Sequence, residues 1–99
     1  MIEEQPFLMA FSNNSPALIV NTPDNIAAYI AANNTNNVRI CAPDETTLIS
    51  SCGPFLDKCV DVRYLNQNIL PKLCAYQRNP ETIQQIKYLG SSRNKGLSR

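Results

Sequence analysis

Histidine and tryptophan are absent from this chain of 99 residues, and only three glycines are present. Without histidine the commonest general base is missing. Ser-His-Asp and Cys-His nucleophile arrangements and histidine-based metal sites are excluded with it. Gly53, Gly90 and Gly96 are too scattered for the glycine-rich loops that bind phosphates in nucleotide-binding proteins. The composition therefore predicts a protein that is not an enzyme and that uses no cofactor.

Long apolar runs are also missing. The longest are Phe7–Phe11 and Ala17–Val20, far short of the ~20 residues that a membrane-spanning helix needs. A secretory signal carries basic residues ahead of its apolar stretch, whereas Glu3 and Glu4 precede the first run here. We therefore expect a cytoplasmic protein with no membrane contact.

The four cysteines are Cys41, Cys52, Cys59 and Cys74. No two of them form the closely spaced C-x₂₋₄-C pair that is typical of structural zinc sites. Disulfides require an oxidising compartment, and no export signal is visible. The spacing favours small buried thiols, and the sequence alone leaves disulfides and metal ligands open as alternatives.

The apolar content is sufficient for a folded core. Ile, Leu, Val and Phe supply 25 of the 99 residues, above the roughly 20% below which a chain is expected to stay disordered. Two apolar runs, 7–11 and 17–20, flank the turn-forming residues 12–16. They predict two short strands that pair as a hairpin.

A helix is predicted from Pro23 to Ala32. Thr22 is a good N-cap, Pro23 suits the first helical position, and Asp24 lies at the positive end of the helix dipole. The asparagine-rich residues 33–37 end this helix, because asparagine tolerates the left-handed conformation.

Further elements follow along the chain. Residues 38–42 and 46–52 are predicted strands, whereas residues 55–62 fit a strand or a helix. Apolar residues from Val62 to Tyr76 recur at helical spacing, and Pro71 predicts a break with a second piece that begins near Asn68. Residues 79–82 repeat the cap-proline-acid start, so residues 80–89 form another predicted helix.

This order predicts a single α+β domain over residues 1–90. We expect two layers, with a small, mostly antiparallel sheet, one helix between strands and two C-terminal helices. Residues 91–99 carry almost no apolar side chain and are predicted to form a flexible basic tail.

The formal net charge of +1 hides an asymmetry along the chain. Residues 1–62 carry seven acids and two bases, whereas residues 63–99 carry seven bases and one acid. Such asymmetry is typical of proteins that bind nucleic acid or an acidic partner. Tyr76 and Tyr88 lie in the basic segment, where tyrosine rings can stack on bases. The candidate partner or nucleic-acid surface consists of Arg63, Lys72, Arg78, Lys87, Arg93 and Lys95.

By elimination, the sequence predicts a small non-enzymatic intracellular protein with a regulatory or interaction role. It is expected to bind a protein partner or to self-associate as a homodimer, since an acidic and a basic face on one molecule favour a symmetric pair. The alternative is nucleic-acid binding through residues 63–99. The sequence pI of about 7.6 argues against it, because a strong basic footprint raises a domain's pI above about 9.

Overall fold

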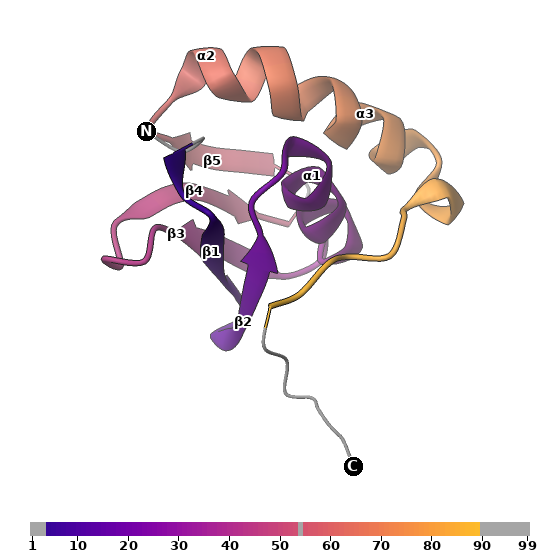
Figure 1. Ribbon diagram of the computed structural model, residues 1–99. Coiled ribbons are helices and arrows are strands. Elements are labelled where there is room, and N and C mark those ends of the chain that lie inside the picture. Colours follow the sequence, from indigo (N-terminus) through magenta and orange to yellow (C-terminus); the bar gives the residue numbers. More distant parts are fainter. Residues whose placement is uncertain (1–3, 54, 90–99) are drawn as a thin grey trace.

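The structure of this chain, a computed structural model, describes residues 4–53 and 55–89. Five strands form one antiparallel sheet in the order β2–β1–β3–β4–β5. The helices pack against one face of it (Figure 1), so the predicted α+β class with a small antiparallel sheet is confirmed. The tail predicted over residues 91–99 lies outside the described residues. The strands are β1 (Phe7–Ser12), β2 (Ser15–Val20), β3 (Asn37–Cys41), β4 (Thr47–Cys52) and β5 (Phe55–Cys59).

The predicted hairpin joins β1 to β2 through a two-residue loop. Asn13 and Asn14 both adopt positive φ, at 50° and 73°, which is the geometry of the tight turns that match strand twist. The loop is fixed to the start of β3, because the Asn13 amide donates to the Asn37 carbonyl and the Asn37 amide donates to Asn13 Oδ1, both at 2.8 Å. The left-handed asparagines therefore belong to the hairpin.

Helix α1 (Pro23–Ala32) lies between β2 and β3 and has the predicted bounds. The backbone N–H of Asn25 donates to Thr22 Oγ1 at 3.1 Å, as expected for an N-cap. The helix ends after Ala32 as predicted, but the predicted left-handed asparagine is wrong, since Asn33 has φ −113°. Its side chain instead donates to the Tyr29 carbonyl at 2.8 Å, which satisfies one of the free carbonyls of the last turn.

One long helix replaces the two predicted pieces between Val62 and Arg78 (Figure 1). It runs through α2 (Val62–Tyr64), the π-helical η2 (Leu65–Ile69) and α3 (Leu70–Arg78). The predicted break near Asn68 is wrong because the helix widens just before Pro71: the Leu70 amide donates to the Leu65 carbonyl, five residues back. Widened turns of this kind accommodate a proline without ending the helix.

The second predicted C-terminal helix is also wrong. Residues Pro80–Thr82 form a single 3₁₀ turn, η3, and residues 83–89 then run extended. Residues 83–89, the edge segment, lie along the outer edge of β2. The Val20 amide donates to the Lys87 carbonyl at 3.0 Å, and the Leu89 amide donates to the Leu18 carbonyl at 2.8 Å. These backbone bonds to β2 replace the bonds that a helix would have made within itself.

Asn25 fastens the edge segment from the side of α1. Its buried side chain, only 4% exposed, donates to the carbonyls of Val20 and Lys87 and accepts from the Lys87 amide, each at 2.8 Å. The side chain thus reproduces the hydrogen bonding of a strand, and it joins α1, β2 and the edge segment at one point.

The core lies between the sheet and the helices. Leu8, Ile40 and Ile49 of the sheet are fully buried in one cluster with α1 and the long helix. The two helices are also joined by a polar contact, since Tyr76 Oη donates to Asp24 Oδ1 at 2.5 Å. This hydrogen bond raises the pKa of Tyr76 above its ordinary value. In the described part of the chain no helix is long and apolar enough to cross a bilayer.

We expect Asn25→Ala to lower the free energy of unfolding by about 2–4 kcal/mol, because it removes three buried hydrogen bonds and leaves the Lys87 amide unpaired. Asn34→Ala is the matched control at an exposed asparagine, and it should change stability by less than about 0.5 kcal/mol. Urea denaturation measures both variants. Hydrogen exchange at the Lys87 and Leu89 amides should accelerate in the Asn25 variant. Unchanged exchange there would show that other contacts hold the edge segment.

The stability of the fold should fall at alkaline pH through Tyr29. Burial, with a smaller contribution from the nearby Tyr88, raises the pKa of Tyr29 from 10.0 to about 12. The folded state therefore favours the protonated phenol more strongly than the unfolded chain does. That stabilisation is complete below about pH 10 and is lost as the pH rises through about 12. Tyr29→Phe should show a smaller loss of stability than the wild type over this range in parallel urea titrations. Equal losses would contradict the assignment.

Candidate functional site

The structure spreads the predicted basic surface over two parts of the molecule. Arg63 and Arg78 lie 15 residues apart, near opposite ends of the long helix, or about 22 Å along its axis at 1.5 Å per residue. Lys72 is exposed between them, and Lys87 is exposed on the edge segment. Arg93 and Lys95 lie outside the described residues. A partner or nucleic-acid surface built from these bases stays a prediction.

One part of that prediction is corrected. Tyr76 is only 7% exposed, and its hydroxyl is bonded to Asp24, so its ring is not free to stack on a base. Tyr88 is about half exposed, but it faces the core side of the sheet, because it pairs with the buried Ile19 across the edge of β2. The helical spacing of the apolar residues from Val62 to Tyr76 already indicated that Tyr76 lies on the core side of its helix.

The four cysteines are free thiols in different environments. Cys41 is buried, Cys59 is half-buried, and Cys52 and Cys74 are exposed. Burial raises the pKa of the Cys59 thiol, which lowers its reactivity. Among the described residues no group of three cysteine or acidic side chains is placed to hold a metal ion.

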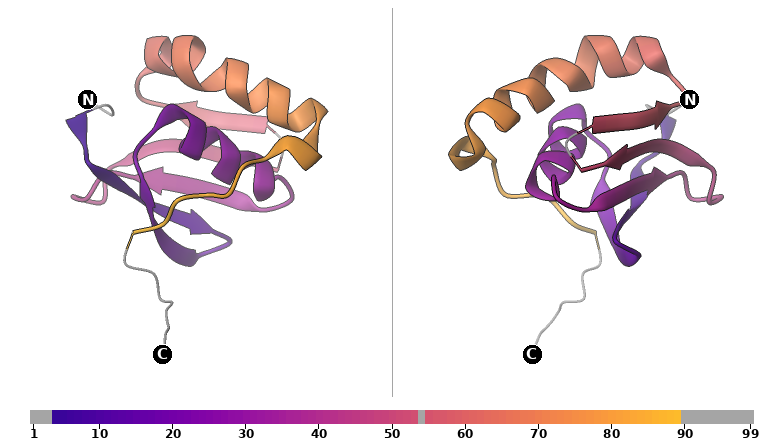
Figure 2. Two further views of the ribbon diagram at one scale, coloured as in Figure 1. Left: turned by 45° about the vertical axis from the view of Figure 1, so that its right-hand side comes forward. Right: turned by 180° about the vertical axis from the view of Figure 1, so that it is seen from behind.

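The face of the sheet opposite the helices is a second candidate site. Side chains alternate along each strand, so Leu8 and Ala10 of β1 point to the core while Phe7, Met9 and Phe11 point the other way. No helix of the described residues covers this side: seen from behind, the strands lie nearest the viewer, with α1 behind them (Figure 2). We call this side the open face.

A row of apolar side chains crosses the open face. In the strand register Leu18 stands opposite Met9, and Met9 stands opposite Cys41. Leu89 extends the row beyond β2, because its amide is bonded to the Leu18 carbonyl beside the Ile19–Tyr88 pair. Leu18 and Leu89 are 37% and 38% exposed. Cys41 is only 1% exposed and adds no accessible surface, so we call Leu89, Leu18 and Met9 the apolar strip.

The next row combines aromatic, charged and hydroxyl groups. Phe11 stands opposite Arg39, Arg39 opposite Ser50, and Ser50 opposite Lys58. The Arg39 Cζ atom lies 4.6 Å from the centroid of the Phe11 ring, in the range of a cation–π interaction. The aromatic ring therefore limits the directions in which the guanidinium can point.

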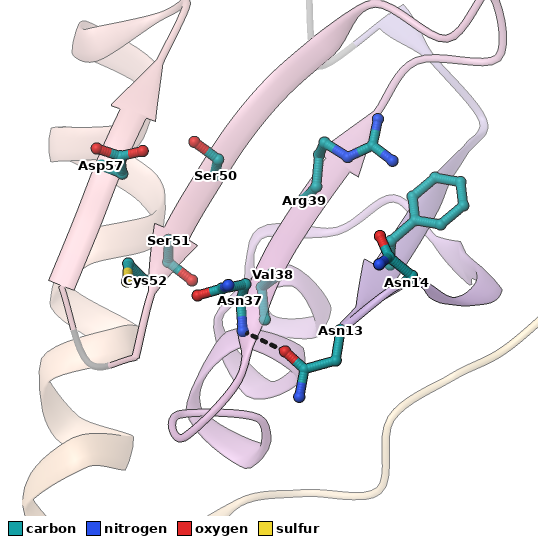
Figure 3. A pocket seen from close by; sticks show the side chains of 10 residues that line it. Asn13, Asn14, Asn37, Val38, Arg39, Ser50, Ser51, Cys52 and Asp57 are labelled. Atoms are coloured by element: carbon teal, nitrogen blue, oxygen red, sulfur yellow. Dashed lines mark hydrogen bonds between the residues drawn. The ribbon is translucent and has the colours of Figure 1, made fainter.

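A depression of about 410 Å³ lies beside this row. Its lining includes Arg39, Ser50, Asp57 and the asparagines of the hairpin loop (Figure 3). Asp57 reaches it because the ladder between β4 and β5 shifts at this point, and an extra residue in a β-bulge re-aims the side chain. The depression holds one positive and one negative side chain, and neither is ion-paired with another described residue.

Sequence reasoning missed this site. The alternation of residues 38–42 predicts that Arg39 lies on the other face of the sheet from Val38 and Ile40, and the register and burial confirm this. The run 7–11, however, is apolar at every position, so it does not show which residues face away from the core. The one local signal was the difference in side-chain size between Ala10 and its neighbours Met9 and Phe11, which separates the two faces of the strand.

No protein-family model, no curated protein and no solved structure matches this chain.

We expect iodoacetamide to modify Cys52 and Cys74 in the native protein at the rates of ordinary exposed thiols. Cys41 should react at least about a hundredfold more slowly, because it becomes accessible only when the strand opens, and Cys59 should fall between them. Mass spectrometry of digests taken over time measures all four rates. A Cys41 rate equal to that of Cys52 would contradict the described packing of β3.

Proposed function

We propose that this protein is a non-enzymatic intracellular interaction module that binds a protein partner through the open face of its sheet. The observation that carries the proposal is the one-sided cover of the sheet. Phe7, Met9 and Phe11 remain half-buried on the uncovered side, beside the exposed Leu18. Contiguous apolar surface of this kind, bordered by polar groups, is typical of protein-binding sites.

The composition of the open face supports a protein as the ligand. Aromatic residues, methionine and arginine are enriched at protein interfaces, and lysine and acidic residues are depleted at their centres. Here Met9, Phe11 and Arg39 are central, whereas Lys58 and Asp57 lie toward the β5 side.

Neither edge of the sheet is well suited to pair with a strand of another protein. The edge segment is bonded to the outer edge of β2. On the opposite edge β5 has only five residues, its pairing is irregular, and it carries Asp57 and Lys58. Short, bulged and charged edge strands resist pairing with other chains. The open face is therefore a better candidate than either edge.

A different protein fits this face better than a second copy does. A two-fold axis through the apolar strip would pair that strip with itself. In such a dimer Arg39 of one copy would not meet Asp57 of the other. Asp57 lies in β5, two strands further from the apolar strip than Arg39 in β3. The homodimer stays a prediction, as does nucleic-acid binding by the basic residues of the long helix.

Site-specific photocross-linking tests the proposal. A photoreactive residue at Leu18, on the apolar strip, should capture one discrete protein partner in the native cell extract. The same residue at the exposed Gln67 is the matched control, since this position lies on the long helix with Arg63 and Lys72. Once purified, the captured partner should bind the wild type at least about tenfold more tightly than Met9→Asp, because a buried unpaired carboxylate opposes association.

Four outcomes would overturn the proposal. Absence of any captured protein at position 18 would leave the open face without a partner. Cross-links from position 67 alone would move the interaction to the basic helix. A cross-linked pair of identical chains from position 18 would replace the partner with a second copy. A captured protein that binds Met9→Asp as tightly as the wild type would show that the open face takes no part.

A further inference from the structure

The charges of the open face indicate which chemistry its partner carries. The guanidinium of Arg39 lies over the Phe11 ring, with Cζ 4.6 Å from the ring centroid, and its other described contact is a weak one from Nη1 to the Cys41 sulfur at 3.9 Å. Stacking on an aromatic ring leaves the hydrogen-bonding edge of a guanidinium available, and that edge matches the two oxygens of a carboxylate.

Asp57 supplies the opposite charge on the same face. It lines the same depression as Arg39, and the two side chains come from β5 and β3, with β4 between them. Two strand spacings amount to about 10 Å, so the two charges do not neutralise each other directly. The depression therefore has a positive side at Arg39 and a negative side at Asp57 (Figure 3).

The apolar strip lies on one side of this pair of charges. Arg39 is two residues from Cys41 along β3, and Phe11 is two residues from Met9 along β1. A ligand whose acidic group meets Arg39 can thus place a neighbouring apolar side chain on Met9. In this arrangement Arg39 is the anchor, Met9 and Leu18 supply apolar contact, and Asp57 sets the orientation.

We infer that the partner, on the proposed function above, presents a carboxylate to Arg39, a cationic group to Asp57 about 10 Å away, and an apolar side chain to the strip. In a peptide with the polyproline II conformation, which repeats every three residues with a rise of about 3.1 Å per residue, an acid and a base three residues apart lie on the same face at about this separation. Charge complementarity of this kind selects among partners and fixes their orientation.

A charge exchange within the protein tests the inference with a defined probe. The double variant Arg39→Asp, Asp57→Arg keeps the net charge and reverses the two charges. Random phage-displayed peptides of about twelve residues are first depleted on this variant and then selected on the wild type. We expect enrichment of peptides with an acid, a base about three positions away and an apolar residue beside the acid.

The most enriched peptide, synthesised with a fluorophore, gives the affinities. Arg39→Gln should weaken its binding about tenfold and Asp57→Asn about threefold, whereas Gln67→Glu at an exposed position of the long helix, which changes the net charge as much as Arg39→Gln does, should leave it unchanged. A second peptide with its acid and base exchanged should prefer the double variant. Absence of enrichment, a motif without an acid, or binding insensitive to Arg39→Gln would each overturn the inference.

Failure here is distinguishable from failure of the proposed function. If the partner captured through position 18 loses affinity for Met9→Asp but not for Arg39→Gln, the face binds a protein and the charge assignment is wrong. If position 18 captures no partner at all, the proposed function itself fails.

Discussion

The arrangement of α1, β2 and the edge segment depends on the side-chain amide of Asn25. It is buried near the start of α1 and makes three hydrogen bonds, one to β2 and two to the edge segment. Because residues 83–89 are held in this way, the outer edge of β2 is closed and the last described part of the chain runs beside the sheet instead of forming a helix. A buried amide satisfied on both its oxygen and its nitrogen is costly to replace, so this point fixes the relation of three segments that are distant in sequence.

Closing that edge bears on the proposed function. The helices cover one face of the sheet, the edge segment covers one edge, and the irregular, charged β5 forms the other. What remains is a face on which Phe11 supports Arg39 and a row of apolar side chains lies alongside. Side chains on a sheet are held by the strand pairing, so a face of this kind is preorganised for recognition. The proposed function follows from this geometry and not from the net charge of the basic segment.

Local signals were sufficient where the chain satisfies its own hydrogen bonds. The cap at Thr22 and the proline after it placed α1 correctly, and the asparagines of residues 12–16 placed the first hairpin. They failed at two places for different reasons: after residues 79–82 the hydrogen-bond partners come from distant parts of the chain, and at Pro71 the helix itself widens. The start signal at residues 79–82 was read as a helix, but the carbonyls and amides that follow are bonded to β2 and to Asn25. Pro71 was read as a break, but the widened turn before it carries the helix through.

Short-range patterns were enough to predict the fold class, the position of α1 and the first hairpin, because caps, turn residues and alternation act over a few neighbouring positions. The division of charge between residues 1–62 and 63–99 is likewise read directly from the sequence. The tertiary structure alone decided which side of residues 7–11 faces away from the core and that Phe11, Arg39 and Asp57 share a face. Strand order and register set those relations, and they arise from the pairing of residues far apart in the chain, which no local pattern encodes.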